Sequence, residues 1–179
     1  MKKSSFLVTA FLFLVSIVQA QGYTQQITNV KTQARIMAEA AMKRDYTTLL
    51  KYINIDGFPK GRLNIMTKAK ALKIIQTADS QMVKQGIAIQ SINFGDVLSI
   101  LKVGFEFQCT MPQTTEMKMQ VGRVITTSTL IGLSEDNGIN WTFIDATGRD
   151  KIEMKRLMPK LSSKLQFAKQ ESPKFISHQ

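Results

Sequence analysis

Few residues in this sequence could perform acid–base chemistry, and the main carboxylate among them is Asp145. It ends an alternating segment in which it shares one face with Trp141 and Phe143. Apolar neighbours raise the pKa of a carboxyl group and so suit it to proton transfer. An aspartate before Ala146-Thr147-Gly148 more often caps a turn, and we interpret Asp145 in that way. Glu106, on the polar face of an earlier strand, is the other carboxylate that could take part in acid–base chemistry.

Thiol and metal chemistry have little support in the sequence. Cys109 is the single cysteine, and the single histidine, His178, is the second-to-last residue. Cys109 lies in an apolar alternation, so we expect it to be a buried hydrophobe rather than a nucleophile. The ten methionines include Met117 and Met119, but no histidine accompanies them, and we expect them to fill the core. We assign no catalytic residue, no metal site and no cofactor.

The first 20 residues have the pattern of a secretory signal peptide. Lys2 and Lys3 give a positive start, and residues 6–18 form an apolar run of about 13 residues. A bilayer-spanning helix needs about 20 residues, so this run is too short for a retained anchor. Val18-Gln19-Ala20 places short side chains at the cleavage positions. We therefore predict export and a mature chain from Gln21 that is periplasmic or secreted.

The predicted mature chain is strongly basic. The whole sequence has a formal charge of +11, and removal of Lys2 and Lys3 leaves +9. Basic domains often bind nucleic acid, but the predicted export excludes that partner. An anionic envelope surface is the alternative partner, set against a solvated basic surface that has none. The basic residues gather in two places: Lys60, Arg62, Lys68, Lys70 and Lys73, and the series from Arg149 to Lys174.

The first half of the mature chain has a helical period. Apolar residues three and four apart predict helices over residues 28–43, 46–53 and 67–85. Asp45 is expected to cap the second helix, and Gly86 to end the third. Between these two helices, the segment from Asp56 to Gly61 contains two glycines and a proline, which predicts a loop.

From Ile87 to Ala146 apolar and polar residues alternate, which predicts antiparallel strands. The first strand covers residues 87–94. The second is expected to be long and to carry these apolar residues on one face: Val97, Leu101, Val103, Phe105, Phe107, Cys109 and Met111. Pro112 predicts a bend or an edge position. A tight turn at residues 120–123 and the Asn137-Gly138 hairpin signal delimit strands over 124–134 and 139–146.

Helices followed by a meander of strands predict an α+β fold. We expect N-terminal helices packed on a curved, cone-like antiparallel sheet of about four to five long strands, with a short C-terminal helix. One cysteine cannot form an internal disulfide, so packing must stabilise the fold. The predicted division is a signal peptide (1–20), a mature N-terminal tail (21–27), a single domain (28–158) and a basic C-terminal tail (159–179).

The segment from Ala40 to Ile53, AAMKRDYTTLLKYI, resembles the junction of the first two helices in the nuclear-transport-factor-like cone fold of the cystatin-like superfamily. In that family an aspartate follows a small helix break and starts a short amphipathic helix, as Asp45 would here. Long curved strands that end the domain are similar as well. Residues 101–143, with CTMPQT at 109–114 and NWTFID at 140–145, resemble small exported proteins of unassigned function from Bacteroidetes-type bacteria.

The resemblance implies a cone lined by apolar side chains. Tyr46 and Tyr52 would border its mouth, and Phe107, Trp141 and Phe143 would lie on the sheet face that lines it. These five are the expected ligand-binding residues. Cone folds include isomerase-like enzymes, dehydratases and ligand binders, so the fold leaves the function open.

Three functions follow from these observations. The missing catalytic set favours an exported, non-enzymatic module that binds a small apolar ligand or a protein partner. An isomerase- or dehydratase-like enzyme would use Asp145 or Glu106 with a tyrosine. A basic envelope protein would bind anionic lipid or glycan. Pairing of two copies through the sheet is a further option.

Overall fold

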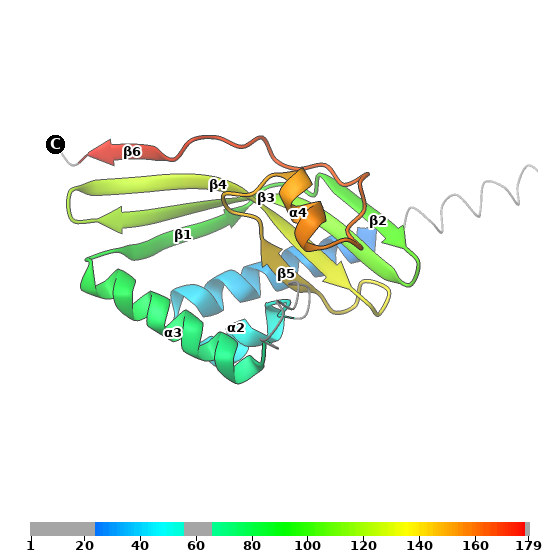
Figure 1. Cartoon of the computed structure of the whole chain (residues 1–179), viewed down its shortest axis with the longest axis horizontal. Helices are drawn as coiled ribbons and strands as arrows, with labels where there is room; N and C mark the ends of the chain where they lie inside the picture. The colour runs from blue at the N-terminus through cyan, green and yellow to red at the C-terminus, as the bar shows by residue number, and fades with distance from the viewer. Residues whose placement is uncertain (1–23, 56–65, 178–179) are drawn as a thin grey trace, which may run out of the picture.

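A computed structural model describes residues 24–55 and 66–177 of the chain. The predicted signal peptide, the loop from Asp56 to Gly61 and His178 lie outside these residues. In the described part, helices precede an antiparallel sheet, and a short helix lies between its fifth and sixth strands in the chain order (Figure 1). The predicted α+β class is therefore confirmed.

The first helix covers residues 24–42 and begins within the segment predicted as a tail. Thr28 Oγ1 donates to the Thr24 carbonyl at 3.0 Å and satisfies one acceptor within the added turn. Arg44 ends the helix in the left-handed conformation, with φ of +57°, and Asp45 N donates to the Ala40 carbonyl at 2.9 Å. This bond pattern is that of a Schellman C-cap, and it turns the chain sharply into the next helix.

Two more helices follow, with the predicted caps. Helix α2 (Tyr46–Tyr52) is capped by Asp45, whose carboxylate accepts a hydrogen bond from Thr48 N at 3.0 Å. Hydrogen bonds from Thr48, first from its side chain and then from its N–H, lower the pKa of Asp45. Helix α3 (Lys68–Lys84) begins at Thr67. Gly86 ends it with φ of +69°, a conformation that glycine adopts without strain. Both predicted helices and their caps are confirmed.

The sheet is built around one long hairpin. Strands β3 (Glu106–Met119) and β4 (Gly122–Ser134) pair from Phe107 opposite Ser134 to Met119 opposite Gly122. Two short strands, β1 (Ala88–Phe94) and β2 (Ser99–Val103), share the free edge of β3. Two others, β5 (Thr142–Asp145) and β6 (Lys174–Ser177), share the free edge of β4.

The predicted long strand from Val97 is wrong, because the chain reverses at Gly104. Gly104 has φ of +64° and, with Phe105, forms the two-residue turn between β2 and β3. Phe105, expected on the buried face, is 92% exposed at the tip of this turn. The described part of the chain therefore has six strands rather than four to five, and only two of them are long.

Pro112 lies in the middle of β3, opposite the interruption between β1 and β2. Its carbonyl accepts from Gly95 N at 2.9 Å, and Leu98 N already donates to the Thr110 carbonyl at 2.8 Å. Proline has no N–H to offer a neighbouring strand. The irregularity that we predicted at Pro112 therefore occurs in its neighbour, where residues 95–98 leave the ladder.

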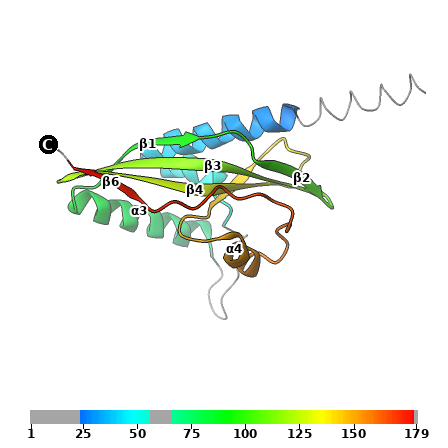
Figure 2. The ribbon, with the colours of Figure 1, turned by 90° about the horizontal axis from the view of Figure 1, so that it is seen from above.

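Apolar clusters cover both faces of the sheet. On one face, Phe107, Cys109 and Met111 pack against Val30 and Ala34 of the first helix. The opposite face carries a second cluster that includes Met154 of helix α4 (Lys151–Leu157). Figure 2 shows the first helix and α4 on opposite sides of the central strands. The sheet is thus the middle layer of the molecule.

The chain beyond residue 158 belongs to this second cluster. Leu161 and Leu165 are fully buried against the sheet. Ser162 N donates to Gln108 Oε1 at 2.7 Å, and Thr110 Oγ1 donates to the Gln166 carbonyl at 2.6 Å. The structure therefore differs from the predicted boundary, because residues 159–168 complete the core instead of forming a tail. None of the described helices has the length and apolar character needed to cross a bilayer.

Candidate functional site

Three of the five predicted ligand-binding residues are core residues. Phe107, Trp141 and Phe143 are buried beneath the first helix, each with at most 5% of its surface exposed. Trp141 Nε1 donates to the Gly138 carbonyl at 3.0 Å, which satisfies the buried indole. Phe107 and Phe143 border none of the clefts described below. Their burial therefore supports stability rather than ligand contact.

Asp145 has the capping role. Its Oδ1 accepts from Thr147 N at 2.9 Å and from Thr147 Oγ1 at 2.7 Å. Its Oδ2 accepts from Gln113 Nε2 at 2.9 Å. Both carboxylate oxygens thus have partners within the protein, and Asp145 does not line the cleft that contains Glu106.

The two predicted tyrosines lie apart. Tyr46 Oη donates to Asp79 Oδ2 at 2.8 Å, a bond that raises the pKa of the phenol. Arg44 forms an ion pair with the same carboxylate at 2.9 Å. Tyr46 therefore joins α2 to α3. Tyr52, at the end of α2, packs against the core and borders a cleft.

This cleft, which we call the Tyr52 cleft, lies at the end of the sheet opposite the β3–β4 turn. Its volume is about 600 Å³. The end of α2 is fixed beside β5 by Asn54, whose N donates to the Phe143 carbonyl at 2.9 Å and whose Nδ2 donates to Thr142 Oγ1 at 2.8 Å. The cleft has these charged or aromatic residues on its walls: Lys51, Tyr52, Glu106, Glu135, Asp136 and Trp141.

One wall of the cleft is the β4–β5 loop, which three side chains of the first helix hold in place. Gln26, Asn29 and Gln33 share one helix face because they are three and four residues apart. Their amide nitrogens donate, in order, to three successive carbonyls: Asn137 at 2.8 Å, Gly138 at 2.9 Å and Ile139 at 2.7 Å. We call these three residues the amide clamp.

The amide clamp also accepts a hydrogen bond from the loop, and Asp136 stabilises the loop through hydrogen bonds within it. Gln33 Oε1 accepts from Trp141 N at 2.8 Å. The Asp136 carboxylate accepts from Asn140 N at 2.9 Å, from Asn140 Nδ2 at 2.7 Å and from Ser134 Oγ at 2.8 Å. Donation from Asn140 N lowers the pKa of Asp136 most. The wall is therefore preformed.

Three charged groups remain to meet a ligand in this cleft. Glu106 Oε1 accepts from Gln108 Nε2 at 2.6 Å, while its Oε2 and the Glu135 carboxylate form no hydrogen bond with the described residues. Lys51 is exposed on the facing wall. The arrangement presents both signs of charge beside the Tyr52 phenol.

Sequence reasoning found Tyr52, Trp141 and Glu106 but did not place them together. The Asn137-Gly138 turn forms as predicted, with both residues at positive φ, and it joins the paired strands β4 and β5. It lies inside a loop that runs from residue 135 to residue 141 and is not a two-residue hairpin turn. The spacing of Gln26, Asn29 and Gln33 was the signal that could have indicated a helix holding that loop.

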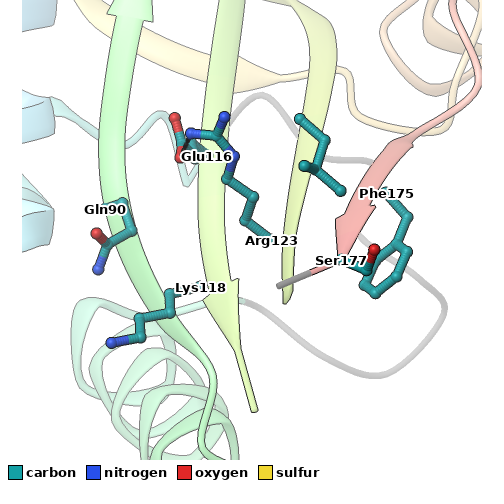
Figure 3. Close-up of a pocket in the computed structure, with 7 residues that line it drawn as sticks. Gln90, Glu116, Lys118, Arg123, Phe175 and Ser177 are labelled. Carbon is teal, nitrogen blue, oxygen red and sulfur yellow. Dashed lines mark hydrogen bonds and ion pairs between the residues drawn. The ribbon is translucent and has the colours of Figure 1, made fainter. Parts of the chain in front are cut away.

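A second cleft, of about 820 Å³, lies near the β3–β4 turn and contains none of the predicted site residues. Glu116 and Arg123 form an ion pair at 2.9 Å across β3 and β4. Figure 3 shows this pair on neighbouring strands, with Lys118 nearer the turn and Phe175 on β6. The surface here is cationic and partly apolar.

Metal and thiol chemistry gain no support from the described residues. No group of three or more histidine, cysteine or acidic side chains could hold a metal among them. Cys109 is buried in the core, and burial raises the pKa of its thiol to about 12. The predicted burial of Cys109 is confirmed.

Comparison with known proteins gives limited information. Neither the protein-family models nor the curated proteins give a match. A solved structure of an LEH-like epoxide hydrolase from M. tuberculosis is similar to this chain at 12% identity and a TM-score of 0.39, over 75% of this chain and 92% of that chain. We draw nothing about activity from a similarity of this size, and the α+β class rests on the structure itself.

Proposed function

We propose that this protein is a binding module that takes a small polar ligand in the Tyr52 cleft. The observation that carries the proposal is the convergence of Tyr52 with charged groups of both signs on preformed walls. Ligand sites are typically clefts of roughly 300–1,000 Å³ with a few convergent polar groups, and this cleft measures about 600 Å³. The ligand is polar rather than apolar because Phe107 and Phe143 are packed in the core.

The lining charges favour a zwitterion. Glu106 and Glu135 offer carboxylate oxygens, and Lys51 offers an ammonium group. A ligand that carries both an ammonium and a carboxylate, such as an amino acid or a short peptide, forms charge-assisted hydrogen bonds with both. Asp136 is left out of this contact because its carboxylate already accepts three hydrogen bonds.

A thermal-shift screen with free amino acids and dipeptides tests this proposal. A ligand at 100 times its Kd stabilises the folded state by about 2.7 kcal/mol, so a bound compound raises the Tm. We expect Lys51→Met and Glu135→Gln to remove the shift, and Lys164→Met, an exposed lysine outside the cleft, to retain it. A panel without any shift, or equal shifts in all variants, would overturn the proposal.

A second candidate, an enzyme, is favoured by the position of Glu106 in the same cleft as Tyr52. In that case Glu106 would transfer a proton within a bound substrate, as an isomerase or dehydratase requires. The variant Glu106→Gln separates the two functions. A binding module shows no turnover of any bound compound with either protein, whereas an enzyme converts its ligand and loses turnover on this substitution.

We also propose that the chain is exported and cleaved after Ala20. The support is the sequence pattern of residues 1–20. Intact mass of the protein from the periplasmic and culture fractions of expressing bacteria tests it. The expected mass is that of a chain beginning at Gln21, and recovery of the uncleaved chain from the cell interior alone would be contrary to this proposal.

A further inference from the structure

Exposed apolar and cationic side chains gather at the end of the molecule that carries the β3–β4 turn. Val121 is 67% exposed at the tip of that turn, and Phe175, on β6, is 54% exposed. Val83 and Ile176 are exposed as well. With two lysines, these residues form what we call the hairpin-end patch: Val83, Lys84, Lys118, Val121, Phe175 and Ile176.

Close approaches of side chains to two glycines show that the three elements of the hairpin-end patch lie together. A Cβ placed on Gly86, just after α3, would lie 2.9 Å from Gln120 Cγ in the β3–β4 turn. A Cβ on Gly122 would lie 2.9 Å from the Phe175 ring. Figure 1 and Figure 2 both place the end of α3, the turn and β6 at the same end of the molecule.

The charge of this end is positive. Lys118 and Lys84 form no ion pair with a described residue, whereas the acidic neighbour Glu116 is already paired with Arg123. In Figure 3 the Lys118 side chain extends away from the Glu116–Arg123 pair. An anionic partner would therefore meet cations that no neighbouring carboxylate neutralises.

We propose that the hairpin-end patch docks on an anionic lipid bilayer. Exposed valine, isoleucine and phenylalanine side chains gain free energy in the acyl boundary, while nearby lysines pair with lipid phosphates. A soluble polyanion would use the lysines alone and leave Val121 and Phe175 in water. The proposal goes beyond the Tyr52 cleft, which lies at the other end of the sheet, so either can fail without the other.

The opposite end of the sheet supplies a natural control. Phe105 is even more exposed, at 92%, at the tip of the β2–β3 turn. Its neighbours there include the carboxylate Glu106 as well as Lys102, so this end lacks a comparable positive field. An exposed aromatic ring whose neighbouring lysine is offset by a carboxylate is not expected to dock on an anionic surface.

Flotation with lipid vesicles tests the proposal on the chain from Gln21, which contains every described residue. We expect binding to vesicles of phosphatidylglycerol mixed with phosphatidylcholine and none to phosphatidylcholine alone. Each of Lys84→Ala and Lys118→Ala should weaken partitioning about fivefold, because a basic residue near an anionic surface contributes about 1 kcal/mol. Raised salt should weaken it further.

The apolar contribution is tested separately. Phe175→Ser and Val121→Ser should each lower partitioning several-fold. Val121 lies outside β6, so the second variant tests the apolar contribution without affecting the pairing of that strand. The matched variants Phe105→Ser and Lys164→Ala should bind as the unchanged chain does. The absence of binding to anionic vesicles, or equal binding to neutral vesicles, would overturn the proposal. Binding that the lysine variants abolish and both serine variants leave unchanged would overturn it as well, because it would indicate that the natural partner is a soluble polyanion.

Discussion

At the residue scale, the core beneath the first helix closes around Gly132. A Cβ at this position would lie 2.8 Å from Cys109 Sγ and 3.2 Å from both Trp141 Cε3 and Val30 Cγ2. Distances this short leave no room for a methyl group in a packed interior. The glycine therefore lets the first helix approach β4 closely.

Gly132→Ala should destabilise the protein by about 1–3 kcal/mol, the usual cost of overpacking a core. Urea unfolding followed by the fluorescence of Trp141, the single tryptophan, measures it. The double variant with Cys109→Ala should recover part of the loss, because it removes the nearest atom. An unchanged midpoint for Gly132→Ala would contradict the packing described here.

Roles that depend on neighbours in the sequence could be predicted, whereas roles that depend on contacts between distant segments could not. The cap at Asp145 could be predicted because its partner, Thr147, is two residues away. The contact with Gln113 could not be, since it crosses from β5 to β3 over 32 residues of sequence. The aromatic residues were correctly placed on one sheet face, but only packing decides that this face meets a helix rather than a ligand.

At the element scale, the amide clamp links the first helix to the β4–β5 loop. Gln33 makes two of its contacts, to the Ile139 carbonyl and from Trp141 N. Helix caps and ends were predictable from short motifs. The reversal at Gly104 was missed because the apolar alternation continues through the turn, and Phe105 keeps the period although it points to solvent.

Gln33→Ala should cost about 1–3 kcal/mol, because it leaves the part-buried Trp141 N–H without its acceptor. Gln76→Ala, a glutamine on the exposed face of α3, is the matched control and should leave stability unchanged. Thermal unfolding by circular dichroism measures both. Equal melting temperatures for the two variants would show that the clamp contributes nothing.

The same loop should make stability depend on pH. Hydrogen bonds, first of all from Asn140 N, hold the pKa of Asp136 below its usual value. The stabilisation is therefore present above the unfolded pKa of about 3.9 and is lost as pH falls through the folded pKa. The Tm difference between the unchanged chain and Asp136→Asn should shrink below about pH 4. A difference that stays constant from neutral to acid pH would exclude this role.

At the scale of the whole molecule, the sheet separates two apolar clusters, and the C-terminal segment covers one of them. The sequence predicted the helices before the sheet and the α+β class, but neither the separate strand β2 nor the strand β6. It did not reveal that residues 159–168 return to the sheet, because Leu161 and Leu165 stand among lysines and their four-residue spacing is that of a helix, which this segment does not form. A contact of this kind depends on the surface that the rest of the chain leaves open.

Two truncations test the role of the C-terminal segment. A stop after Met158 would expose Ile131 and Ile144 and remove the partners of Gln108, so we expect the loss of cooperative unfolding. A stop after Pro173 removes only β6, all of whose side chains are exposed, and should leave the transition cooperative. Guanidinium unfolding distinguishes them, and similar cooperative curves for both truncated chains would contradict the second core.

The binding function itself has a direct optical test, because Trp141 borders the Tyr52 cleft and is the single tryptophan. Titration of the chain with the amino acids and dipeptides of the thermal-shift panel should give a saturable change in tryptophan fluorescence for the compound that binds. The double variant Lys51→Met with Glu135→Gln should lose that change, and Lys164→Met should keep it. A flat titration with every compound, or the same saturation curve in the double variant, would contradict a ligand site in this cleft.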